Sequence, residues 1–236
     1  MTSVCVIVGA GEGLGKALAE KFSAEGMQIA LISRSKPDYL TELGQIGSVE
    51  HYKADALNPE DMESTLGRVQ NDFGGVDTLV YNVRGNFESC EPLQMSYEAL
   101  DENFRLEVIG AFASAKSVLP AMIRRGSGNI FFSSATAAFR GSARYPVYAI
   151  GKFGLRGLSQ SLAKAYGKNG VHIVHFRLDC DLDVPVMQAL YADRYDPDKL
   201  AQPKDVAEIY WLTRLQSRGA WSNEVEIRPA TENWTY

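Results

Sequence analysis

A glycine-rich turn between an apolar strand and a helix constrains the fold of this chain more than any other feature. The apolar run Val4–Val8 leads directly into a turn with glycine at positions 9, 11, 13 and 15. A helical pattern continues from this turn through Lys16–Phe22. Glycines there let the backbone turn tightly and approach a ligand closely, and the helix N-terminus stabilises negative charge. The pattern predicts a βα unit that binds a pyrophosphate.

Short strand-like runs alternate with longer amphipathic segments along the rest of the chain. This alternation predicts an α/β fold, with a doubly wound parallel β-sheet and helices on both faces. In an open sheet of this kind, ligands bind beyond the carboxyl ends of the strands. The predicted strands are Val4–Val8, Gln28–Ser33, Val49–Lys53, Thr78–Tyr81, Asn129–Ser133, Val171–Leu178 and Glu224–Arg228.

Composition indicates one globular domain over residues 1–236, with 45% hydrophobic and 22% charged residues and no linker or repeat. A net charge of -5 gives no electrostatic reason to expect nucleic acid or an anionic membrane as a partner. The three scattered cysteines, Cys5, Cys90 and Cys180, fit a reducing compartment, and the three histidines lack metal-ligand spacing. Because no leader segment or apolar run of about 18 residues is found, a cytoplasmic protein is expected. The histidine spacing predicts that the protein holds no metal.

Tyr148 and Lys152 are the residues that indicate chemistry most directly. A spacing of four places both side chains on one face of a helix, where the ammonium favours the ionised form of the phenol. A tyrosine that ordinarily titrates near ~10 would then act as an acid or base close to neutral pH. Tyr145 is set aside because it lies seven residues from Lys152 and precedes Pro146.

The glycine spacing Gly-x-x-x-Gly-x-Gly, with Tyr-x-x-x-Lys far downstream, resembles the classical short-chain dehydrogenase/reductase family over almost the whole chain. The resemblance implies a single-domain Rossmann-fold oxidoreductase with a nicotinamide cofactor. In that family the Tyr transfers a proton at the substrate oxygen, and the Lys binds the nicotinamide ribose and lowers the pKa of the Tyr. These roles fall on Tyr148 and Lys152. The cofactor loop falls on Gly9, Gly13, Leu14 and Gly15.

Two further positions match the family's cofactor site. Asp55, after the third predicted strand, lies where the family has an Asp that contacts the adenine, although a turn or helix cap is the alternative interpretation. Asn82 resembles the Asn that supports the central strand beside the cofactor.

The end of the second predicted strand bears on the choice of cofactor. Ser33 and Arg34 stand where an acidic residue would accept the ribose 2′-hydroxyl of NAD, and they can bind a 2′-phosphate. Glu12 argues against this, because a carboxylate pointing inward would repel that phosphate. The sequence therefore favours NADP over NAD and leaves NAD open.

The upstream serine that orients the substrate in the family is displaced in this chain. Counting thirteen residues back from Tyr148 leads to Ala135, and Ser134 is one residue further. Either a longer loop makes Ser134 the catalytic hydroxyl, or a neighbour such as Thr136 or Ser142 replaces it.

Other positions also depart from the family pattern. Glu107 stands where the family has an Asn that holds a water beside the Lys, with Asn103 one turn earlier. A carboxylate there would pair with the Lys152 ammonium and weaken its effect on the phenol. Arg84 replaces a small residue near the nicotinamide.

Acidic and apolar residues follow the sixth predicted strand. The acidic residues at positions 179, 181 and 183 fit a solvated turn better than a metal site. Segment 184–201 matches the family's substrate-covering loop, and an ordinary packed amphipathic helix is the alternative. Its apolar and aromatic residues are Met187, Leu190, Tyr191 and Tyr195.

These features favour an NADP(H)-dependent oxidoreductase of the carbonyl reductase or alcohol dehydrogenase type, acting on a small-molecule carbonyl or alcohol. Tyr148, Lys152, Ser134 and Glu107 are the candidate catalytic residues. The alternative is a catalytically weak or inactive nucleotide-binding sensor or scaffold with the same fold. By resemblance, helices around Glu98–Leu119 and Val147–Gly167 would form a homodimer or homotetramer.

Overall fold

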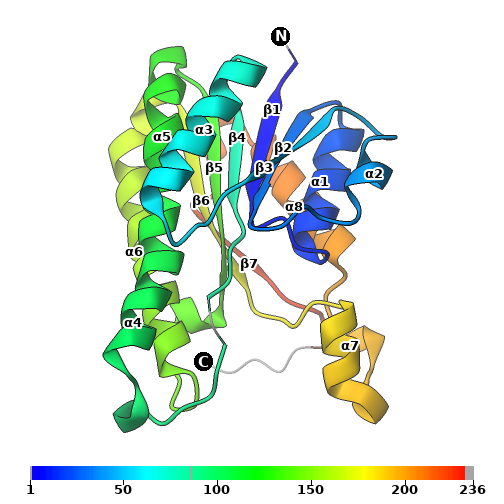
Figure 1. Cartoon of the computed structure of the whole chain (residues 1–236), viewed down its shortest axis with the longest axis vertical. Helices are drawn as coiled ribbons and strands as arrows, with labels where there is room; N and C mark the ends of the chain where they lie inside the picture. Colours follow the sequence, from blue (N-terminus) through cyan, green and yellow to red (C-terminus); the bar gives the residue numbers. More distant parts are fainter. Residues whose placement is uncertain (1, 86, 232–236) are drawn as a thin grey trace.

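Seven parallel strands form one sheet, in the order β3-β2-β1-β4-β5-β6-β7 (Figure 1). The computed structural model describes residues 2–85 and 87–231. All seven predicted strands are confirmed; the fifth is longer than predicted at both ends, and the seventh ends one residue earlier. The strands are β1 Val4–Val8, β2 Gln28–Ser33, β3 Val49–Lys53, β4 Thr78–Tyr81, β5 Gly128–Ala135, β6 Val171–Leu178 and β7 Glu224–Ile227.

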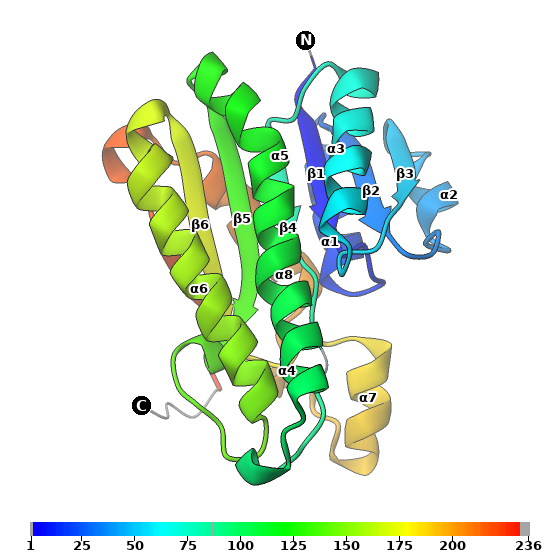
Figure 2. The ribbon, with the colours of Figure 1, turned by 60° about the vertical axis from the view of Figure 1, so that its left-hand side comes forward.

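Helices cover both faces of the sheet, which confirms the doubly wound α/β architecture (Figures 1 and 2). One face is covered by α1 Leu14–Ala24, α2 Leu40–Leu43 and α8 Pro203–Arg214. The other is covered by α3 Pro59–Phe73, α5 Gly110–Arg125 and α6 Pro146–Tyr166. Helix α4 Tyr97–Phe104 continues through a π turn, Arg105–Ile109, into α5. Helix α7 Pro185–Tyr191 lies beyond the carboxyl ends of the strands.

The core consists of two apolar layers separated by the sheet. Val6 and Val8 of β1 pack toward α3 and α5, whereas Cys5 and Ile7 pack toward α1 and α8. Successive side chains of a strand point to opposite faces, so a strand covered on both faces is apolar throughout. This explains why the strand runs read as continuous apolar segments in the sequence.

One helical stretch among the described residues, Tyr97–Arg125, is long and apolar enough to cross a membrane, since it contains an 18-residue window with a mean hydropathy of 1.4. The expectation that no segment approaches that length is therefore corrected. Half of the apolar window is buried inside the fold. Its buried residues, such as Val118 and Met122, belong to the core layer that α5 shares with α3. The stretch therefore serves as a core helix here.

The strand order reverses direction beside β1, since the chain moves outward from β1 to β3 and then returns to β4. Loops that leave β1 and β4 consequently diverge at the carboxyl edge of the sheet and leave a crevice between them. The glycine turn follows β1 at this edge, and the segment beginning at Asn82 follows β4. A ligand site is therefore expected here.

Candidate active site

The glycine turn forms a close-fitting cradle between β1 and β4. Gly9 has a φ of +88°, and a Cβ there would lie 2.6 Å from the carbonyl oxygen of Asn82. A Cβ on Gly15 would lie 2.8 Å from the carbonyl oxygen of Gly9. The Asn82 side-chain amide donates a hydrogen bond of 3.1 Å to that same Gly9 oxygen. These positions thus require glycine, and Asn82 fixes the turn against the central strand.

A cleft of about 1500 Å³ extends from this cradle across the carboxyl edge of the sheet. It brings together many of the residues that the sequence predicted for the site. Those that line it are Gly9, Gly13, Leu14, Gly15, Asn82, Ser134, Tyr148 and Lys152. Arg84, Thr136 and Ser142 also line it, while Ser33, Arg34, Asp55 and Glu107 are not among its lining residues.

Tyr148 and Lys152 lie together in the buried part of the cleft. Both belong to α6, and the Lys152 Nζ is 5.5 Å from the centroid of the Tyr148 ring. Only 7% of Tyr148 and 2% of Lys152 are exposed. The prediction that a spacing of four brings the ammonium beneath the phenol is confirmed.

The net effect on the phenol differs from the sequence-based expectation. Burial raises the pKa of Tyr148, Lys152 opposes this, and the Glu107 carboxylate adds to it, so the pKa ends above its ordinary value. The pKa of Tyr148 is thus shifted away from neutral pH and not toward it, contrary to the expectation from the sequence. The lysine acts in the predicted direction, but desolvation is the larger effect.

Glu107 pairs directly with Lys152, as the sequence predicted. Its side chain is fully buried in the π turn, and its Oε2 lies 2.7 Å from the Lys152 Nζ. Its Oε1 accepts a hydrogen bond of 2.6 Å from the backbone N–H of Gly85. Burial alone would lower the pKa of Lys152, but the carboxylate and the phenol outweigh it and leave that pKa raised. The Lys152 ammonium thus stays charged, and the Glu107 carboxylate balances most of that charge.

Asn103, one turn before Glu107, has a different role. Its side-chain amide donates a hydrogen bond of 2.7 Å to the carbonyl oxygen of Val147. That carbonyl belongs to the first turn of α6, immediately before Tyr148. Asn103 therefore positions the helix that carries the phenol.

No candidate hydroxyl takes over the upstream serine position unambiguously. Ala135 ends β5. The Thr136 hydroxyl donates to Asp179, and the Ser142 hydroxyl accepts backbone N–H groups of its own turn, at 3.0 Å and 3.3 Å. The buried Ser134 hydroxyl has no hydrogen-bond partner in the described part of the chain. Ser134 is therefore the candidate with free bonding capacity.

The residues predicted to select the cofactor lie at the same sheet edge, outside the cleft lining. Ser33 ends β2, and its hydroxyl donates to the carbonyl oxygen of Ser35 at 2.7 Å. Arg34 is exposed beside it. The Asp55 carboxylate accepts a hydrogen bond of 3.0 Å from the N–H of Leu57. This contact matches the turn interpretation of Asp55.

An aromatic cluster of Phe87, Tyr145 and Tyr148 was not anticipated. The Phe87 ring stacks on Tyr145 with centroids 4.1 Å apart, and it meets Tyr148 edge-on at 5.0 Å. The Arg84 guanidinium lies 6.0 Å from the Phe87 centroid. Because Phe87 is 61 residues from Tyr148, no local periodicity links them. The only available signal was that Arg84 and Phe87 follow a strand that ends at the ligand-binding edge.

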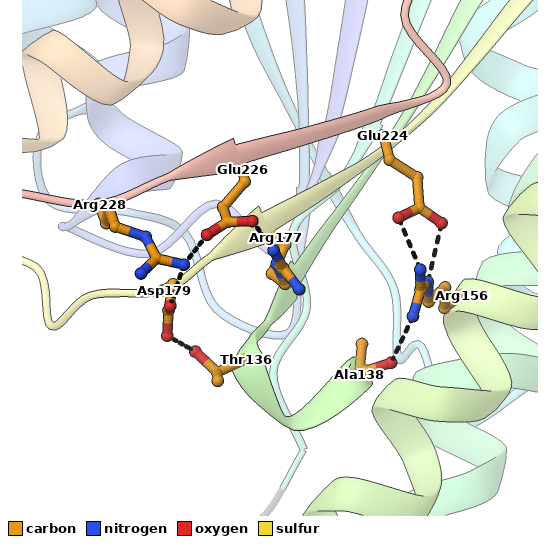
Figure 3. Close-up of polar contacts among 8 residues, drawn as sticks. All are labelled: Thr136, Ala138, Arg156, Arg177, Asp179, Glu224, Glu226 and Arg228. Carbon is orange, nitrogen blue, oxygen red and sulfur yellow. Dashed lines mark hydrogen bonds and ion pairs between the residues drawn. The ribbon is translucent and has the colours of Figure 1, made fainter. Parts of the chain in front are cut away.

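Asp179 belongs to a polar network that ties the cleft floor to β7 (Figure 3). Its carboxylate pairs with Arg228 at 2.7 Å and accepts the hydroxyl hydrogen of Thr136. Glu226 pairs with both Arg228 and Arg177. Asp179 is consequently committed to structural contacts.

The neighbouring carboxylates have separate partners. Asp181 accepts a hydrogen bond of 2.5 Å from the Tyr191 hydroxyl. Asp183 accepts one of 3.0 Å from the Tyr195 hydroxyl. Among the described residues, no group of three or more His, Cys, Asp or Glu side chains is arranged to hold a metal ion. These contacts fit the turn interpretation of the acidic segment.

Segment 184–201 forms part of the cleft lining. Met187, Leu190 and Tyr191 line the cleft from α7. Tyr195, also predicted to line it, instead bonds to Asp183 and is not a lining residue. A Cβ on Gly13 would lie 2.9 Å from the Val184 side chain, so the start of this segment touches the glycine turn.

The strand order and the glycine cradle at the reversal point define a dinucleotide-binding α/β protein. The sequence model of the family described as short chain dehydrogenase matches residues 3–179, and the chain belongs to that family. This confirms the resemblance found in the sequence, and it makes the chain a member of an oxidoreductase family.

Relatives cover nearly the whole chain at low identity. An uncharacterized oxidoreductase of Staphylococcus aureus is 25% identical over 230 residues, which is 96% of each chain. Carbonyl reductase family member 4 of Xenopus laevis is 26% identical over 173 residues, or 73% of each.

Solved structures share the fold. A short-chain dehydrogenase from Rhodopseudomonas palustris is 27% identical, with a TM-score of 0.81 over 96% of this chain and 98% of that one. L-sorbose reductase from Gluconobacter frateurii, solved with NADPH and L-sorbose, is 24% identical, with a TM-score of 0.85 over 97% and 95%. A Brucella melitensis 3-oxoacyl-[acyl-carrier protein] reductase, solved with NAD, is 23% identical, with a TM-score of 0.85 over 96% and 95%.

Proposed function

We propose that this protein is an NADP(H)-dependent carbonyl reductase, with the reverse alcohol dehydrogenase reaction at higher pH. The observation that carries the proposal is the convergence of Tyr148 and Lys152 in a cleft that begins at the glycine cradle. A phenol that can donate a proton and a dinucleotide cradle in one cleft are the two requirements for hydride transfer coupled to proton transfer.

The cradle fits a dinucleotide, because Gly13, Leu14 and Gly15 line the cleft at the N-terminus of α1, where the helix stabilises the negative charge of a phosphate. A bound nicotinamide would supply hydride to a carbonyl carbon, or accept it from an alcohol. In reduction, Tyr148 gives its phenolic proton to the carbonyl oxygen, and the Lys152 ammonium stabilises the resulting phenolate. The raised pKa of Tyr148 keeps the phenol protonated at neutral pH, which suits the reductive direction.

NADP is the proposed cofactor. Arg34 is exposed at the end of β2, where it is free to meet a ribose 2′-phosphate, and the solved L-sorbose reductase of the same fold carries NADPH. The Brucella reductase of the same fold carries NAD, so the preference for NADP over NAD needs a direct test. Titration of the purified protein with NADPH and NADH should give a lower Kd for NADPH.

Replacing Tyr148 with Phe tests the catalytic assignment. We expect Tyr148→Phe to lower kcat on ketones and aldehydes by about 10²-fold or more, with the Kd for NADPH nearly unchanged. Tyr97→Phe is the matched control, because Tyr97 is 88% exposed and does not line the cleft. Unchanged turnover in Tyr148→Phe contradicts the assignment.

The second candidate function is a nucleotide-binding sensor or scaffold. It is favoured by Ala135 at the family's serine position and by the neutralisation of Lys152 by Glu107. A sensor would bind NADP(H) without turnover on a broad panel of carbonyl compounds, and Tyr148→Phe would leave its ligand response intact. Measurable reduction that depends on Tyr148 rejects this alternative.

A further inference from the structure

We propose that Arg84 is an anion receptor beside the phenol, and that the carbonyl substrate carries a carboxylate or similar anionic group on an apolar or aromatic body. This inference rests on the proposed reductase function and specifies its substrate class.

Arg84 is an exposed cation in the same cleft as Tyr148. It lines the cleft from the segment after β4, and its guanidinium lies 6.0 Å from the centroid of Phe87. Phe87 in turn meets the Tyr148 ring edge-on at 5.0 Å. The positive charge of Arg84 acts to lower the pKa of both Tyr148 and Lys152, although other effects leave both pKa values raised. An anion bound by Arg84 would therefore lie near the carbonyl that Tyr148 protonates.

A hydrogen bond to the buried Glu107 fixes the backbone next to Arg84. The N–H of Gly85, the next residue, donates its 2.6 Å hydrogen bond to the buried Glu107 carboxylate. A guanidinium on a fixed segment loses less freedom on binding than one on a loose loop. Arg84 is thus preorganised to meet a ligand group.

Two other charged side chains of the cleft already have counter-charges. Lys152 is paired with Glu107, and Asp179 is paired with Arg228. Arg84 has no ion pair within the described part of the chain. Because a carboxylate and a guanidinium form strong charge-assisted hydrogen bonds, an anionic ligand group is the natural counter-charge for Arg84.

Two more arginines reinforce the positive charge. Arg140, from the segment between β5 and α6, and Arg194, which follows α7, line the same cleft. The three guanidiniums come from three different parts of the fold, in a chain whose net charge is -5. Asp179 and Asp181 also line the cleft, but cationic side chains outnumber carboxylates along its lining, which favours a ligand of negative charge.

The apolar and aromatic residues that line the cleft indicate the chemistry of the rest of the substrate. Phe87 and Tyr145 line one side of the cleft, and Met187 and Leu190 line it from α7. Flat rings and flexible apolar chains favour an aromatic or branched aliphatic body. An oxo acid such as benzoylformate joins both properties and serves as the probe, with its methyl ester as the uncharged match.

The first test compares kcat/KM for benzoylformate and methyl benzoylformate with NADPH. We expect the native protein to prefer the acid, and Arg84→Gln to lower kcat/KM for the acid about ten- to hundredfold while the ester changes little. Arg84→Lys should keep part of the preference. Arg124→Gln is the control, since Arg124 is exposed in the last turn of α5 and does not line the cleft. Equal losses on acid and ester, or a preference for the ester, overturn the proposal.

A binding measurement separates this inference from the reductase proposal. Benzoylformate and its ester are titrated into the protein with NADP⁺, which cannot reduce them. Tighter binding of the acid that is lost in Arg84→Gln supports the anion site even if turnover is absent, in which case only the reductase assignment fails. Equal binding of both compounds overturns the anion site. Selective weakening of NADPH binding in Arg84→Gln would assign Arg84 to a cofactor phosphate and likewise overturn it.

Discussion

Glu107 is a charged residue in a fully buried environment. It lies entirely inside the protein, and its two carboxylate oxygens meet the Lys152 ammonium and the Gly85 N–H. Each charge is costly to bury alone, and the pair is tolerable because each neutralises the other. The same carboxylate also opposes ionisation of Tyr148, so we expect Glu107 to affect both stability and chemistry.

Glu107→Gln should lower the free energy of unfolding by about 3 kcal/mol, because Lys152 is left buried without a counter-charge. The pKa of Lys152 is raised in the folded protein. The pair therefore contributes fully below the ordinary lysine pKa of about 10.4, and this contribution is lost as the pH rises through the higher folded value. Urea unfolding at pH 7 measures it in full.

The double variant Glu107→Leu with Lys152→Met is the matched control for this effect. It removes both charges at similar volume, and it should recover most of the lost stability. If Glu107→Gln is as stable as the native protein, the ion pair does not support the fold.

At the scale of elements, the helix between β4 and β5 is interrupted in a specific way. One helix was predicted around Glu98–Leu119, and the structure has α4, a π turn and α5 in its place. The π turn carries Glu107 into the interior, and π turns often occur at functional sites. The Tyr81 hydroxyl donates a hydrogen bond of 2.5 Å to the carbonyl oxygen of Leu106, which anchors this turn to β4.

Strand β6 contains a titratable group that makes stability depend on pH. His175 is fully buried, and neither ring nitrogen has a hydrogen-bond partner among the described residues. Burial lowers the pKa of His175 to about 4, partly opposed by Glu224 and aided by Arg156 and Lys152. In the unfolded chain a histidine binds a proton near pH 6.5. Between these values the unfolded state holds more protons than the folded one.

The free energy of unfolding should therefore fall as the pH drops from about 6.5 toward 4, with His175 accounting for about 3 kcal/mol of the loss. His175→Leu should flatten this part of the profile, because leucine has nothing to protonate. Urea unfolding at pH 7.0 and pH 4.5 measures the difference. The same loss in both proteins would show that His175 does not control acid stability.

At the scale of the whole molecule, helices α4, α5 and α6 lie side by side (Figure 2), and they carry exposed apolar residues. Phe104 and Phe112 on α4 and α5 are 43% and 46% exposed, and Ile150 and Phe153 on α6 are 43% and 45% exposed. Exposed apolar residues gathered on neighbouring helices are typical of an interface between subunits. The homodimer or homotetramer predicted from the sequence would bury them.

Sedimentation equilibrium should therefore give a mass of two or four chains for the native protein. Phe112→Glu should shift the mass toward one chain, because a carboxylate would be buried at the interface. Leu212→Glu is the control, since Leu212 is 51% exposed on α8, on the opposite face of the sheet. A native monomer, or equal masses for Phe112→Glu and the native protein, contradicts this assignment.

The sequence alone determined the layered architecture, the cradle and the pairing of Tyr148 with Lys152. These depend on local properties: apolar strand runs such as Val4–Val8, glycines without a Cβ, and the helical repeat. Contacts between distant segments were decided by the tertiary structure. Phe87 reaches Tyr148 only through the path of the chain after β4.

The pKa of the phenol is the clearest case of a property set by tertiary structure. From the sequence, the Lys152 charge was expected to lower it, and the charge does so. The fold also removes water from Tyr148 and places Glu107 against the ammonium, and together these raise the pKa above its ordinary value. The sequence shows which side chains carry a charge. Desolvation depends on how many segments pack around a group, and only the folded chain determines that packing.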